Sequence, residues 1–192
     1  MDSLSTYTDP VLSGIGENDR EVILRIANEA LRGLLLKEEF PPPKHEGILN
    51  VKAGVFVTLK SRGQLRGCVG YPEPVFPLWE GVRKSAISSA VMDPRFNNVQ
   101  KEEITRLTIE VTILSPKWEY VHERDHLEIG KHGLIVENDL TSGLLLPQVA
   151  VEEVFTVEEF LDATCLKAGL EEGCWRDENV RTFYFEGLFF QG

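Results

Sequence analysis

The sequence has little cysteine, no long apolar run and no surplus of positive charge. Its three cysteines, Cys68, Cys165 and Cys174, form no CxxC pair and no Cys/His cluster with zinc-ligand spacing. They therefore predict no metal site and no disulfide framework, and their scarcity favours a reducing, cytoplasmic location. No stretch approaches the roughly 18 apolar residues that cross a bilayer. The start, MDSLSTYTDP, also lacks the basic and then apolar pattern of a signal peptide, so we expect no membrane association.

Positive charge is scarce as well. Lysine and arginine number 20 against 31 aspartates and glutamates, which gives a formal net charge of -11 at pH 7. Nucleic-acid binding needs a dense basic face that displaces counterions from phosphates, and no basic run supplies one. P-loop, GxGxxG, HExxH and GxSxG patterns are also missing from the sequence. We therefore expect no nucleic-acid partner and no cofactor.

One order of elements is predicted twice along the chain. Hydrophobic residues make up 42% of the 192 positions, enough for a core. We predict a loose arm over residues 1–17 and a single domain over 18–192 that can include a smaller lobe. Helical periodicity runs from an Asn18 cap to Phe40, where three prolines end it. Two sets of strand, strand, helix and strand follow. The first has strands at 54–57 and from Leu65, a helix from Pro77 to before Asp93, and a strand at 106–114. The second has strands at 133–136 and from Leu144, a helix at 156–169, and a strand at 181–190.

These two sets predict an α+β fold, with a mixed β-sheet flanked by helices. Gly54 to Leu65 has the same spacing as Gly133 to Leu144, so we predict an internal duplication of a β-β-α-β unit. Chance recurrence of a common α+β pattern is the alternative.

The stretch QLRGCVG, residues 64–70, is the strongest candidate for a site. Strand alternation places Arg66 and Cys68 on the same face, and a fixed guanidinium favours the thiolate that nucleophilic cysteine chemistry requires. Gly67 and Gly70 leave the backbone open to close approach. The alternative is that Cys68 packs as a small hydrophobic residue, as free cysteines usually do.

Four other residues are candidates, each with an ordinary alternative. His132, just before a predicted strand, is the best candidate base for Cys68, and otherwise a turn histidine. Glu110, in a Thr-Glu-Thr stripe, is a natural partner for Arg66 or part of a solvated face. Gln148 follows Pro147 on the predicted strand that begins at Leu144. It is either an oriented amide or an ordinary polar residue at the edge of the sheet. Arg95 is an anion contact or a surface charge.

Five motifs occur in an order that resembles a known family: LRGCVG, DPRF, LEIGKHGLIVE, GLLLPQVAVE and FLDATCLKAGL. The family is the one named for the AMME syndrome critical region (the AMMECR-one domain), and the resemblance covers about residues 20 to 190. Its signature is usually written LRGCIG, so Val69 is a mild departure. The matching stretches are Leu65–Gly70, Gly130–Gly133 and Leu146–Gln148.

The resemblance implies an α+β fold with a smaller lobe, in an intracellular protein whose biochemical activity is not settled. Prokaryotic relatives are often encoded beside, or fused to, Memo-type and radical-SAM proteins, so the resemblance also implies such a partner by association. Two hypotheses follow. The chain is a cysteine-dependent enzyme or small-molecule site centred on the LRGCVG hairpin, or it is a non-catalytic adaptor for a Memo-type or radical-SAM protein.

Overall fold

The computed structural model describes residues 9–40, 46–121 and 125–192, which divide into two units. The N-terminal unit comprises Asp9–Leu114 and Leu188–Gly192, and the C-terminal unit comprises Ser115–Gly187. The last strand, β7 (Arg181–Gln191), contributes residues to both units. Within the described residues, no helix is long and apolar enough to span a membrane.

The N-terminal unit begins with a short helix where the sequence predicted a loose arm. Helix α1 (Pro10–Gly14) is capped by Asp9, whose carboxylate accepts hydrogen bonds from the N–H groups of Val11 and Leu12. Leu12 is buried, so the prediction for residues 1–17 is wrong over this stretch. Residues 1–8 of the predicted arm lie outside the described residues.

The long predicted helix is present with shifted ends. Helix α2 (Glu17–Leu36) begins one residue before Asn18, and Asp19 accepts a hydrogen bond from the N–H of Gly16 at its start. It ends at Leu36 because Lys37 takes a left-handed conformation, with φ of 59°.

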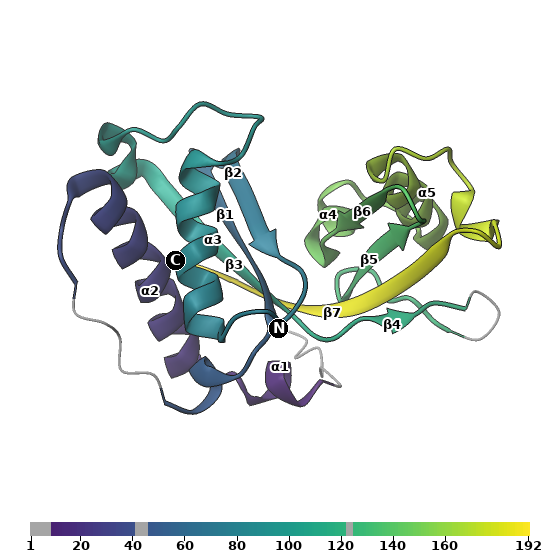
Figure 1. Ribbon diagram of the computed structural model, residues 1–192, viewed down its shortest axis with the longest axis horizontal. Coiled ribbons are helices and arrows are strands. Elements are labelled where there is room, and N and C mark those ends of the chain that lie inside the picture. Colours follow the sequence, from purple (N-terminus) through teal and green to yellow (C-terminus); the bar gives the residue numbers. More distant parts are fainter. Residues whose placement is uncertain (1–8, 41–45, 122–124) are drawn as a thin grey trace. The chain divides into compact units, whose positions relative to one another are not determined.

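Three antiparallel strands form most of the sheet in this unit. Strand β1 (Gly54–Ser61) is central and pairs with β2 (Gln64–Tyr71) and β3 (Leu107–Leu114). The end of β7 extends the sheet past β3, with backbone hydrogen bonds between Ile109 and Gly192. Helix α3 (Leu78–Val91) packs against β1, β2 and α2 (Figure 1). The 3-10 turns η1 (Gly47–Asn50) and η2 (Lys101–Arg106) connect these elements.

The two faces of this sheet differ in chemistry because side chains alternate along each strand. The face toward α3 carries the buried residues Val55, Val57, Leu59, Ile109, Val111 and Ile113. The opposite face carries Phe56, Thr58 and Lys60 from β1 and Thr108, Glu110 and Thr112 from β3. The candidate site lies on this second, more polar face.

The C-terminal unit has a second antiparallel arrangement. Strand β5 (His132–Glu137) pairs with β6 (Ser142–Leu145) and with β7, and β4 (Trp118–Glu119) also pairs with β7. Helix α4 (Pro147–Glu152) follows β6, and α5 (Val157–Lys167) packs against β5 and β6. Helix α5 begins with a capping box, in which Thr156 and Glu159 bond each other's backbone N–H groups.

A disulfide corrects the expectation drawn from the sparse cysteines. Cys165 in α5 is bonded to Cys174 in η3 (Cys174–Arg176), with their Cα atoms 5.9 Å apart. The chain turns back after α5, and Asp162 holds the returning segment by accepting hydrogen bonds from Gly173 N–H and Trp175 Nε1. The two cysteines are nine residues apart in the sequence, and this spacing alone does not predict the turn that brings them together. Of the three cysteines, all of which lie in the described residues, Cys68 is the one outside the disulfide.

The two units share a strand order. Each has its first strand in the middle: β1 between β2 and β3, and β5 between β6 and β7. In each unit, the helix packs closely against a glycine on the second strand. A Cβ added at Gly67 would lie 2.0 Å from Ser89 O, and one added at Gly143 would lie 2.3 Å from Ala168 N. The internal duplication stays a prediction, which superposition of residues 54–114 on 133–190 tests.

The apolar residues of these helices and strands form the core. Leu31, Ile109, Val111, Ile113, Leu134, Val136 and Phe185 are at most 6% exposed, whereas Leu34 is only half-buried.

Truncation of the most buried of these residues should leave cavities. We expect Leu31→Ala and Val111→Ala each to lower the free energy of unfolding by about 1–4 kcal/mol, measured by urea titration. Leu34→Ala is the matched control and should cost less than Leu31→Ala, because its side chain is partly exposed in the native state. Equal losses at Leu31 and Leu34 would contradict this assignment.

Candidate functional site

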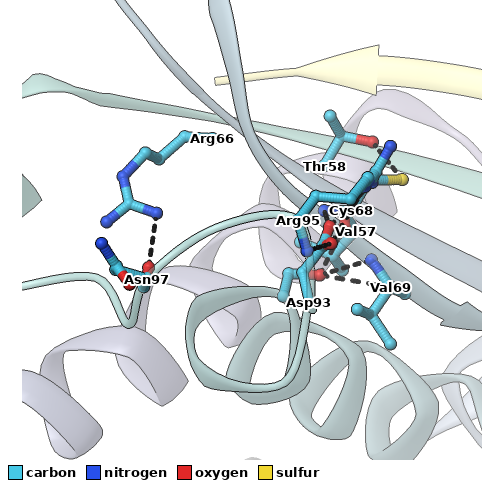
Figure 2. A network of polar contacts seen from close by, with 9 residues as sticks. Val57, Thr58, Arg66, Cys68, Val69, Asp93, Arg95 and Asn97 are labelled. Carbon is cyan, nitrogen blue, oxygen red and sulfur yellow. Dashed lines mark hydrogen bonds and ion pairs between the residues drawn. The ribbon is translucent and has the colours of Figure 1, made fainter.

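Cys68 lies on an edge strand, and a carboxylate binds its backbone N–H. Strand β2 is at the end of the sheet order, so one side of its backbone has no partner strand among the described residues. The N–H of Cys68 donates to Asp93 Oδ2 at 2.8 Å, and Asp93 lies two residues after the end of α3. On the other side, the hydroxyl of Thr58, its partner on β1, donates to Cys68 Sγ at 3.2 Å (Figure 2). The thiol is half-buried.

Asp93 also holds Arg95 beside Cys68. Asp93 Oδ1 accepts from the N–H and Nε of Arg95 at 3.1 and 2.9 Å, and Oδ2 accepts from Nη2 at 2.7 Å. The hydrogen bond from Arg95 is the main reason that the pKa of Asp93 falls from 3.8 to about 2, and the N–H of Cys68 adds to it. Asp93 is therefore a carboxylate throughout the neutral range.

Arg95 and Cys68 interact electrostatically. Hydrogen bonding to Asp93 is the largest cause of the raised pKa of Arg95, and negative charge on Cys68 raises it further. An attraction of this kind is reciprocal, so the guanidinium favours the thiolate form of Cys68.

Arg66 lies elsewhere, although the sequence predicted it as the cation beside the thiol. Figure 2 shows its side chain directed toward Asn97 and away from the group around Cys68. Nε and Nη2 donate to the two oxygens of Glu103, and Nη1 donates to Asn97 O. These bonds tie the segment around η2 to β2.

A β-bulge explains why the predicted arrangement of Arg66 is wrong. Leu59 pairs with Gly67 but Lys60 pairs with Leu65, so Arg66 is the extra residue with no partner on β1. Bulges redirect side chains and interrupt strict alternation. Glu110 accordingly pairs with Lys60, at 2.8 Å between Nζ and Oε1, and not with Arg66.

The glycines of the hairpin serve packing. A Cβ at Gly67 would lie 2.0 Å from Ser89 O of α3, and one at Gly70 would lie 2.3 Å from Val55 O and 2.4 Å from Phe56 Cγ. Ser89 also accepts a hydrogen bond from the N–H of Val69 and donates to Val57 O. The close approach that these glycines permit is therefore made by the protein's own elements.

One row of side chains crosses the sheet, from Cys68 on β2 through Thr58 on β1 to Glu110 on β3. Thr58 is the direct cross-strand partner of both Cys68 and Glu110. Side chains paired in this way have Cβ atoms about 4.5–5.5 Å apart. The row places a thiol, a hydroxyl and an ion-paired carboxylate side by side on one face of the sheet.

His132 and Gln148 belong to the C-terminal unit. His132 begins β5, where its Nδ1 accepts a hydrogen bond from Glu128 N–H at 2.9 Å and its ring packs edge-on against Tyr184. Burial, followed by the charge of Lys131, lowers the pKa of His132, so the ring is neutral at pH 7.

With Nδ1 acting as an acceptor, Nε2 of His132 carries the ring proton, which favours a donor role over a base. Its assignment as the base for Cys68 stays a prediction. Gln148 is the second residue of α4, so the prediction that it lies on a strand is wrong; Pro147 starts this helix because a proline fits the first helical turn.

Thr58 and Asp93 are site residues that the sequence reasoning missed. Thr58 is recognisable only once the pairing of β1 with β2 is known. Asp93 belongs to the DPRF motif, but its contact with Cys68 depends on how α3 packs against β2. Among the described residues, no group of three or more His, Cys, Asp or Glu side chains could hold a metal ion.

Comparison with known proteins gives consistent matches over nearly the whole chain. A family profile described as AMMECR1 matches residues 24–190. Protein NEQ441 of Nanoarchaeum equitans is 41% identical over 180 residues, covering 91% of this chain and 98% of its own. Protein Ta0236 of Thermoplasma acidophilum is 43% identical over 173 residues, covering 87% and 84%. The crystal structure of the uncharacterized protein PH0010 from Pyrococcus horikoshii is 42% identical, with a TM-score of 0.82 over 89% of this chain and 90% of that one.

The lowered pKa of Asp93 predicts a specific acid sensitivity. A carboxylate with a lowered folded-state pKa stabilises the fold above its unfolded value, and this contribution is lost as the pH falls through the folded value. We expect the free energy of unfolding to fall more between pH 4 and about 2 in the wild type than in Asp93→Asn, by on the order of 1 kcal/mol, in urea titrations at each pH. Glu102→Gln, at an exposed side chain, should follow the wild type. Parallel curves for the wild type and Asp93→Asn would contradict the prediction.

Proposed function

The chain belongs to the AMMECR1 family, and we propose that it uses the hairpin around Cys68 as a small-molecule site in which the thiolate is a nucleophile or covalent acceptor. The observation that carries the proposal is the pair of groups that favour a thiolate at Sγ. Thr58 donates a hydrogen bond to the sulfur, and the guanidinium of Arg95 supplies positive charge beside it. The thiolate is the reactive form of cysteine.

The carboxylate of Asp93 opposes this effect, but its charge is already engaged. It accepts four hydrogen bonds, one from the N–H of Cys68 and three from Arg95. A carboxylate paired in this way repels a neighbouring thiolate less than a free one. Asp93 acts in the proposal as a positioning residue, because it holds Arg95 against β2.

The test is the pH dependence of alkylation of Cys68 by iodoacetamide, followed by peptide mass. We expect a reaction in the folded protein with a midpoint below the ordinary thiol value of about 8.5. Thr58→Val keeps the shape of the side chain but removes the donor, so the midpoint should rise. Thr108→Val, on the same face of the sheet, is the matched control and should leave it unchanged.

Two results would overturn the proposed function. One is Cys68 that stays inert until the protein unfolds. The other is Cys68 that reacts with the pH dependence of an ordinary thiol in the wild type and in Thr58→Val. The disulfide blocks Cys165 and Cys174 in this experiment, so the signal comes from Cys68 alone.

The alternative is an adaptor role, which one surface feature favours. The connection after β2, within residues 71–77, holds three prolines and the hydrophobic Val75, which is 54% exposed. A Memo-type or radical-SAM protein is the partner that the family resemblance suggests. In this case Val75→Asp should abolish co-purification with such a partner while Cys68→Ser leaves it intact, and the reverse pattern would count against the adaptor role.

A cytoplasmic location also stays a proposal. Disulfides are rare in that compartment except in hyperthermophilic organisms. The Cys165–Cys174 bond therefore counts against a cytoplasmic location unless the organism is a hyperthermophile.

A further inference from the structure

The two arginines of the site differ in how many of their donors are in use. All three nitrogens of Arg66 donate to the protein: Nε and Nη2 to Glu103, Nη1 to Asn97 O, and Nη2 also to Asn98 O. Its side chain is 18% exposed. Arg95 is 48% exposed, and its side chain donates from Nε and Nη2 alone, both to Asp93.

Arg95 therefore keeps an open end. A guanidinium has five N–H donors, and Asp93 accepts two of them, so three have no partner among the described residues. These three are both protons of Nη1 and one of Nη2. The Nε edge is fixed by Asp93, and the guanidinium carbon lies 5.5 Å from the centre of the Phe96 ring. The open end is thus oriented by the protein and remains available to a ligand.

We propose that the ligand of this site carries a carboxylate, which binds the open end of Arg95 while the reacting atom of the ligand meets Cys68 Sγ. The inference rests on the proposed function of Cys68. Arg95 bridges two carboxylates in this arrangement, that of Asp93 at its Nε edge and that of the ligand at the edge formed by Nη1 and Nη2. The fork geometry of a guanidinium suits this pairing.

The charge of the site favours a head group with a single negative charge. Arg95 already shares its charge with Asp93, and two other cations on the hairpin strands, Lys60 and Arg66, are paired with Glu110 and Glu103. A phosphate carries about 1.5 to 2 negative charges at pH 7, which this set of paired cations would leave uncompensated. A carboxylate carries one charge and matches the planar donors of Arg95.

Two alkylating reagents of nearly equal size test the proposal directly. Iodoacetate carries a carboxylate and iodoacetamide a neutral amide. With either reagent the thiolate of Cys68 attacks the methylene carbon, a C–S bond forms, and iodide leaves with the electron pair of the C–I bond. The ratio of the two second-order rate constants, iodoacetate to iodoacetamide, removes effects on the thiolate itself and reports recognition of the carboxylate.

We expect this ratio to be about threefold or more higher in the wild type than in Arg95→Gln, at low salt and pH 7. Arg66→Gln is the matched control and should keep the wild-type ratio, because its donors are used within the protein. Arg95→Lys keeps the charge but loses the fork, and should give an intermediate ratio. Propionate should slow the reaction with iodoacetamide in the wild type and not in Arg95→Gln, and phosphate should protect less than propionate.

The outcomes separate this inference from the proposed function. Equal ratios in the wild type and Arg95→Gln would overturn the carboxylate assignment, while reaction with iodoacetamide at a lowered midpoint would still support the reactive thiolate. Better protection by phosphate than by propionate would overturn the choice of head group. Inertness of Cys68 to both reagents in the folded protein would overturn the inference and the proposed function together.

Discussion

The hydrogen bond from the N–H of Cys68 to Asp93 is the interaction on which the site depends. It satisfies a donor on β2, the last strand in the sheet order of the described chain, and it fixes the chain just after α3 to β2. The same carboxylate orients Arg95 through three further hydrogen bonds. One buried carboxylate thus connects the backbone of the candidate nucleophile to the cation that interacts with its thiolate.

The local packing explains why this connection is rigid. Gly67 allows the carbonyl of Ser89 to approach β2, and the Ser89 hydroxyl bonds Val57 and Val69 on the two strands of the hairpin. The end of α3 is thereby held against the hairpin by backbone contact and by a side-chain bridge. Arg66 secures the same strand at a second point, through Glu103. Of the two arginines, one completes the scaffold and the other keeps donors available.

The sequence predicted the elements of this fold better than the details of its site. Helical periodicity identified α2, and apolar strand patterns identified the long strands, because each buries a regular apolar face. Boundary signals located the other two helices: Pro77 for α3, and Thr156 with Glu159 for α5. Strand periodicity placed Arg66 beside Cys68 because alternation assumes an unbroken strand, and the bulge at Arg66 depends on pairing with β1. Gln148 was assigned to a strand because the end of β6 before Pro147 leaves no clear signal. The Cys165–Cys174 bond depends on a turn that Asp162 holds, and such a tertiary contact is invisible in spacing.

The most direct test of this account is a double-mutant cycle between Asp93 and Arg95, read from the rate of Cys68 alkylation by iodoacetamide at pH 7. Asp93→Asn has two effects in the wild-type background: it removes a negative charge near the thiolate, which speeds the reaction, and it releases Arg95, which slows it. Only the first effect remains in the Arg95→Gln background. The account therefore predicts that Asp93→Asn speeds alkylation by a larger factor when Arg95 is already replaced. The same factor in both backgrounds would show that Asp93 does not hold Arg95 in place for Cys68, and would contradict the account.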